Sequence, residues 1–123
     1  MIQSFPVLTT LAAWRGVVLD TGTAGAVTYP QAATSYPIGV TKDTVLETTG
    51  SIEVAGPGEI AKLFFNDTIA TGLRVALNNA GQGVAHVDTT AGSYVLGILV
   101  GPTVAATGTI ADVYIMPHFK SIP

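Results

Sequence analysis

The chain repeats itself, and this repeat limits the folds open to it more than any other feature does. A shift of 58 positions aligns LAAWRGVVLDTGTAGAV (11–27) with IATGLRVALNNAGQGVA (69–85), without a gap. The same shift aligns SYPIGV (35–40) with SYVLGI (93–98), and TTGSI (48–52) with ATGTI (106–110). A structural unit that is too small to bury its own apolar face can close a core by packing on its copy. We therefore expect a pseudo-two-fold domain with repeat halves at about 11–68 and 69–123.

The residues of each half are typical of β-strands. Val, Ile, Thr and Tyr occur in short runs separated by Gly, Pro, Asn and Asp. Some runs alternate, so that Ile52 and Val54 would face inward around Glu53. No window of 11 residues keeps a helical apolar stripe free of Gly and Pro; Thr9–Trp14 and Asp67–Gly72 are the best short helical candidates. The predicted fold class is all-β, a small β-barrel or sandwich. The expected strands are Trp14–Leu19, Ala26–Tyr29, Pro37–Val40, Ser51–Ala55, Ile60–Phe65, Leu73–Leu77, Val84–Val87, Tyr94–Val100 and Thr109–Met116.

Residues 1–10 lie outside the aligned repeat and form either an N-terminal arm or an edge strand of the same domain. Pro6 favours an extended backbone there, with Phe5 and Val7 as apolar anchors. Residues 11–123 are expected to form a single domain, because 123 residues is an ordinary length for one. The first residues lack the basic start of a signal peptide, and no apolar run is long enough to span a bilayer.

The composition is poor in charge. Asp, Glu, Lys and Arg make up 11% of the chain, against about 25% in average soluble domains. The net charge of −3 and the five dispersed basic residues argue against a nucleic-acid partner, which needs clustered Lys or Arg. A surface with so few charges exposes neutral and apolar area of the kind that marks interfaces. On apolar size and position alone, the candidate interface residues are Phe5, Val7, Trp14, Phe64 and Phe65.

Groups that could carry catalysis are scarce. His86 and Asp88 could pair at i, i+2 on a strand, but an acid–base pair needs a nucleophile or substrate site nearby, and a metal site needs three or four ligands. Asp20-Thr-Gly resembles an aspartic-protease loop, yet its repeat equivalent is Asn78, so the second carboxylate is absent. There is no cysteine. We expect no catalytic, cofactor or metal site; a small hydrolase that uses His86 and Asp88 is the alternative.

Two phrases of the chain resemble a known family. The first reads LAAWRGVVLDTGTAGAV…YPIGV…TTGSIEV, and the second reads IATGLRVALNNAGQGVA…YVLGIL…AATGTIADVYI. In order and spacing they resemble the paired phrases of the small capsid decoration (cement) proteins of tailed phages, of the DUF2190-like kind, over residues 11–116. The chain departs from that pattern at Trp14-Arg15, where the family has Ala-Gly, and in a longer loop around Tyr29–Thr34.

The resemblance implies a non-enzymatic virion protein on the outer surface of an HK97-fold phage capsid, made in the host cytoplasm, which stabilises the shell by bridging capsomers. Its partners would be the major capsid protein and further copies of itself, as a homotrimer or alternatively a dimer, with neither nucleic acid nor membrane. The alternative is another β-rich phage interaction module, such as a tail or fibre domain or a sugar-binding adhesin. The single tryptophan, Trp14, motivates that alternative.

Overall fold

The computed structural model describes residues 2–7, 11–20, 22, 25–30, 36–42, 51–86 and 93–120. All regular structure in these ranges is β, which confirms the predicted all-β fold class. The described parts of the two short helical candidates form turns, bends and isolated bridges. The strands are β1 (Ile2–Pro6), β2 (Gly16–Leu19), β3 (Val27–Thr28), β4 (Pro37–Thr41), β5 (Ser51–Ala55), β6 (Ile60–Phe65), β7 (Arg74–Leu77), β8 (Gly83–Ala85), β9 (Ser93–Leu99) and β10 (Thr109–Lys120).

A strand is present at each of the nine expected places. Their ends differ from the expected ones by at most two residues, except that β10 continues four residues past Met116. The additional strand, β1, pairs antiparallel with β5 at the edge of the first sheet. Of the two forms considered for the N-terminal segment, residues 2–6 therefore adopt the edge strand.

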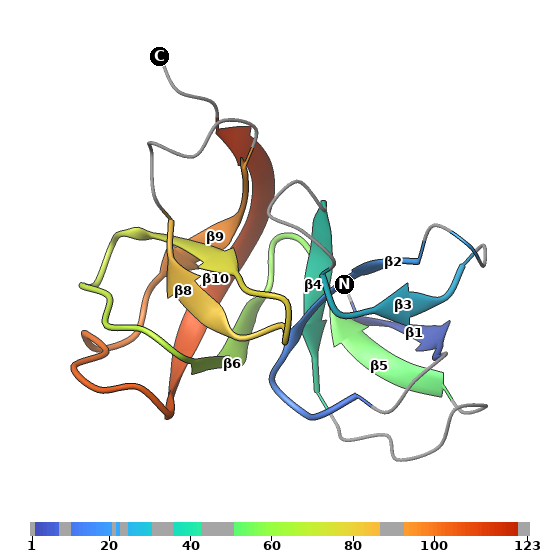
Figure 1. The fold of residues 1–123 in the computed structure, drawn as a ribbon, viewed down its shortest axis with the longest axis horizontal. Helices are drawn as coiled ribbons and strands as arrows, with labels where there is room; N and C mark the ends of the chain where they lie inside the picture. The colour runs from blue at the N-terminus through green and yellow to red at the C-terminus, as the bar shows by residue number, and fades with distance from the viewer. Residues whose placement is uncertain are drawn as a thin grey trace.

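The strands form two lobes that lie side by side (Figure 1). The first lobe, β1 to β5, is a sheet in the order β1-β5-β4-β2-β3, and the second lobe, β6 to β10, is a closed barrel in the order β10-β6-β8-β7-β9. Each strand has the same neighbours in both lobes when β1 is matched with β6, β2 with β7, and so on. The two similar halves are thus real, but they divide between Ala55 and Ile60, rather than at the expected 68/69, and β1 belongs to the repeat.

The closure of the second barrel has a counterpart in the first lobe. In the barrel, β6 and β8 meet in a parallel pair between Phe65 and Gly83. In the first lobe, a single parallel bridge joins Val7, which is the repeat equivalent of Phe65, to Val27. The first lobe is therefore an incompletely closed version of the same barrel.

Two repeated glycines, Gly39 and Gly97, have the same structural role in the two lobes, which explains why the repeat is recognisable in the sequence there. Val17 pairs with Gly39 between β2 and β4, and Val75 pairs with Gly97 between β7 and β9, in the same register. A Cβ atom at Gly39 or Gly97 would collide with a backbone carbonyl oxygen of the next strand, β5 or β10. Close approach of two backbones is one of the few tasks that only glycine performs.

The last strand of the second half, β10, pairs in a register shifted by one residue from that of its equivalent, β5. Phe5 of β1 pairs with Ile52, whereas Leu63, its equivalent in β6, pairs with Ala111 rather than Ile110. A one-residue shift moves a side chain to the opposite face of a sheet. Accordingly, Ile52 is 2% exposed and Ile110 is 39% exposed, although the sequence aligns the two isoleucines.

The buried side chains form two apolar clusters rather than one common core. The first consists of Val7, Leu11, Val17, Val27, Ile52 and Val54. The second consists of Val40, Ala55, Leu63, Phe65, Ile69, Val75, Leu96, Leu99, Val104, Ala111, Val113 and Ile115. Because each sheet curls around its own side chains, each lobe has its own interior. Val40 and Ala55 are the exception, since they come from the first lobe and belong to the cluster of the second.

Candidate interaction surface

The structure separates the five residues expected at an interface. Val7 and Phe65 are core residues, 2% and 0% exposed, so they offer no surface. Phe64 faces the other way from Phe65 and is half-buried beneath Arg15, whose guanidinium carbon lies 4.2 Å from the centre of the ring. Phe5 is half-buried and lines a groove, and Trp14 is exposed. Apolar size pointed to all five residues, but strand alternation decides which of them reach the surface.

Trp14 has a strained backbone. Its φ of +59° lies in the left-handed region, and the repeat-equivalent residue is Gly72, with φ +89°. The turns are the same, because the Trp14 N–H donates to the Thr41 carbonyl (2.9 Å) and the Gly72 N–H donates to the Leu99 carbonyl (2.8 Å). A bulky residue in this conformation costs about 1–3 kcal/mol, and such strain clusters at functional sites. The indole, 38% exposed, is thus a candidate contact.

The strain at Trp14 can be measured with two variants. Trp14→Ala and Trp14→Gly both remove the indole, but only Ala keeps a Cβ at positive φ. We expect the Gly variant to exceed the Ala variant in free energy of unfolding by about 1 kcal/mol. Urea unfolding of both proteins measures this difference. Equal stability, or a more stable Ala variant, would mean that the turn does not require glycine geometry.

Backbone hydrogen bonds join the two lobes along a seam. Gly16 donates its N–H to the Gly81 carbonyl (2.7 Å), and Phe64 donates its N–H to the Trp14 carbonyl (2.9 Å). A Cβ atom at Gly16 would collide with the side chain of Leu77, so the two lobes touch directly there.

Equivalent rows of residues cross the outer faces of the two lobes. In the first lobe, the row Gly16, Val40 and Ala55 crosses β2, β4 and β5 and is buried. The second lobe has an equivalent row, which consists of Arg74 on β7, Ile98 on β9 and Tyr114 on β10. Ile60 of β6 extends this row, because it pairs with Tyr114. We call these four residues the second outer row. Ile60 is 63% exposed and Tyr114 is 38% exposed. Apart from Arg74, which is also exposed, this row is apolar, and Ile98 is half-buried. By contrast, all three residues of the first-lobe row, which we call the first outer row, are buried.

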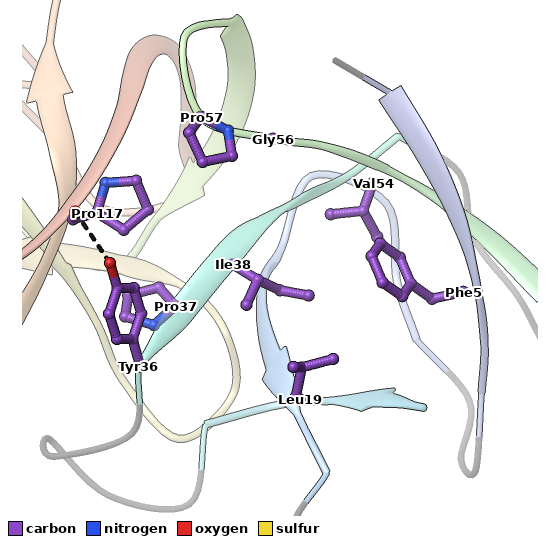
Figure 2. Close-up of a pocket in the computed structure, with 9 residues that line it drawn as sticks. All are labelled: Phe5, Leu19, Tyr36, Pro37, Ile38, Val54, Gly56, Pro57 and Pro117. Atoms are coloured by element: carbon purple, nitrogen blue, oxygen red, sulfur yellow. Dashed lines mark hydrogen bonds between the residues drawn. The ribbon is translucent and has the colours of Figure 1, made fainter. Parts of the chain in front are cut away.

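An apolar groove of about 380 Å³ opens on the first lobe (Figure 2). Its lining residues are Phe5, Leu19, Tyr36, Pro37, Ile38, Val54, Gly56, Pro57 and Pro117. Figure 2 shows the Tyr36 hydroxyl directed at the Pro117 carbonyl of β10, 3.3 Å away, so the groove wall spans both lobes. The Tyr36 ring stacks on the ring of its repeat equivalent, Tyr94, with 4.8 Å between centroids. Leu19 and Tyr36 are about half exposed in the groove.

The residues that suggested chemistry in the sequence are His86, Asp88 and the tripeptide that begins at Asp20. The described residues contain no group of three or more His, Cys, Asp or Glu that could hold a metal ion. His86 is half-buried, and Asp88 lies outside the described residues, so their expected pairing cannot be placed. Asp20 accepts a hydrogen bond from the Gly22 N–H (3.0 Å), an Asx turn that accounts for the protease-like tripeptide. In the part of the chain that the structure describes, no helix could cross a membrane.

Comparison with known proteins identifies a fold. No protein-family model and no curated protein matches the chain. Among solved structures, the chain is similar to the one titled "The crystal structure of head fiber gp8.5 N base in bacteriophage phi29". The TM-score is 0.70 at 18% identity, and the match covers 94% of this chain and 95% of that chain. The likeness therefore extends over both lobes and shows that the two chains share a fold.

Proposed function

We propose that the chain is a structural protein of a phage virion that binds the outer surface of the capsid and stabilises the shell. The observation that carries the proposal is the fold shared over 94% of the chain with the base of a phage head fibre. The two sequence phrases that resemble capsid decoration proteins support the same role independently. Such a protein needs no catalytic group, and we propose that it is not an enzyme.

The surface of the chain suits adhesion to a shell. Charged residues are few, and several large apolar side chains are exposed. Contacts that are weak for one copy become strong when many copies bind one particle. Self-association, as a homotrimer or alternatively a dimer, would present the same surface to neighbouring major capsid proteins and so bridge capsomers. Trp14 is the first candidate contact, because its exposed indole is kept despite backbone strain.

Capsid binding can be tested with the purified chain and undecorated capsids of the phage that encodes it. Co-sedimentation should saturate at a fixed number of copies per particle, and the decorated shells should resist heating better than bare shells. Trp14→Ala should weaken binding about tenfold, since a buried tryptophan is a common hot spot. Ile110→Ala, at a residue of similar exposure, is the matched control and should bind like the parent. Binding that never saturates, or none at all, would contradict the proposal.

A fibre base is the second candidate function, favoured by the likeness of the fold to the base of a phage head fibre. In that case the chain would anchor a projecting partner rather than cement the shell. Electron microscopy of saturated capsids separates the two functions: low bumps that stabilise the shell indicate cement, and a bound projection without added heat resistance indicates a fibre base. An adhesin would instead bind a glycan array, more weakly after Trp14→Ala.

A further inference from the structure

The contact between the two lobes can serve as a template for a contact between two chains. In the seam, the outer row of the first lobe covers the interior of the second lobe. Val40 and Ala55 join the apolar cluster of the second barrel, and Leu77 of that barrel packs on Gly16. One lobe thus supplies a row of outward-facing residues, and the other supplies a socket made of its own barrel interior.

The first lobe has the same socket, and it is open. The groove residues Phe5, Leu19, Ile38 and Val54 occupy the places that Leu63, Leu77, Leu96 and Val113 hold in the second lobe. In the second lobe, Leu63, Leu96 and Val113 belong to the buried cluster that Val40 and Ala55 of the first lobe join. Leu77 packs against that cluster. In the first lobe the same places line the groove of about 380 Å³, and Leu19 is 47% exposed where Leu77 is partly buried. The groove is therefore the uncovered counterpart of an occupied socket.

The second lobe has the matching row, in which Ile60 and Tyr114 are exposed. Ile98 and Tyr114 occupy the places of Val40 and Ala55, and Ile60 extends the row at its β6 end. Each chain thus carries both halves of one kind of contact, with the row on one lobe and the socket on the other. The seam itself uses the opposite pairing, the row of the first lobe with the interior of the second lobe.

We propose that chains associate head to tail, with the second outer row of one copy seated in the groove of the next. A second copy is the occupant because it supplies the complementary surface already used inside the chain. Tyr114 and Arg74 are larger than Ala55 and Gly16, so the new contact must be wider than the seam. The empty groove provides that room. Since the two surfaces differ, the contact is heterologous. Such a contact closes a ring when the successive rotations complete a full turn and forms an open filament otherwise, and the homotrimer of the proposed function would be such a ring.

This inference rests on the self-association in the proposed function and names its surfaces. The test uses the full chain in solution and measures mass by sedimentation velocity. The parent should form an oligomer. Leu19→Glu, in the groove, and Ile60→Glu, on the row, should each yield monomers of 12.6 kDa. Both side chains are exposed enough for the variants to fold, and Tyr36→Glu serves as a second groove variant. Ile110→Glu, on the same face of β10 but away from the row, should stay oligomeric.

Mixing the two monomeric variants gives the decisive result. Leu19→Glu retains an intact row, and Ile60→Glu retains an intact groove, so one contact can form between them. The mixture should therefore contain dimers and nothing larger. Monomers in the mixture, or a parent chain that stays monomeric up to its solubility limit, would overturn the head-to-tail contact. A monomeric parent that still saturates capsids would overturn this inference and leave the proposed capsid binding standing.

Discussion

Replacing Gly97 by Ala is expected to lower the free energy of unfolding by about 3 kcal/mol, at the upper end of the usual cost of overpacking. Gly97 lies in β9 between β7 and β10, opposite Val75 and Ile115. An added Cβ would collide with the carbonyl oxygen of Tyr114, which is backbone and cannot rotate away. The barrel can accept the methyl group only if β9 and β10 separate locally and lose ladder hydrogen bonds.

Two other glycines make this result interpretable. Gly39→Ala, the repeat equivalent, should cost a similar amount because its Cβ would meet the Ala55 carbonyl oxygen. Gly22→Ala should change stability little, since its nearest neighbour would be a side-chain oxygen of Asp20 at 3.4 Å. Urea unfolding of the three variants measures the differences. If Gly97→Ala were as stable as Gly22→Ala, close packing of the strands would not be the reason for the repeated glycine.

The sequence predicted the fold best where the residue pattern and the requirements of backbone geometry agree. Short Val- and Ile-rich runs between Gly, Pro and Asn predicted nine strands, and Gly39 and Gly97 marked the repeat because no other residue fits there. The first strand of the repeat was missed for the opposite reason. IQSFP and IAKLF share only their first residue when aligned, because strands β1 and β6 need only extended backbone. Equivalent strand pairing therefore survives without recognisable sequence likeness.

The exposed surface was harder to predict, because an apolar residue in a strand is normally assigned to the buried core. Ile60 and Tyr114 lie in runs that look buried, yet the structure leaves both exposed. A usable signal was present in the charges between apolar residues. Lys62 in β6 and Asp112 in β10 face each other across the strands, 3.6 Å apart, and mark the outward face. Side chains two residues from either charge share that face. The groove could not be inferred in this way, since it exists only because the first lobe stays open.

The adjacent residues Phe64 and Phe65 provide the sharpest test of this inside-outside assignment. Phe65→Ala should lower the free energy of unfolding by about 4 kcal/mol, the usual cost of deleting a buried phenylalanine side chain. Phe65 is 0% exposed in the second cluster, and its ring packs on Gly83 where the barrel closes. Removing it leaves a cavity at the parallel junction of β6 and β8.

Phe64→Ala is the matched control, with the same substitution one residue away. Phe64 is half-buried on the outer face, so its loss removes the contact with the Arg15 guanidinium and some apolar burial, about 1 kcal/mol. Thermal unfolding should therefore show the Phe65 variant melting roughly 10 °C below the Phe64 variant. Similar losses in the two variants would mean that β6 does not keep this register, and the outward placement of Ile60 in the second outer row would fail with it.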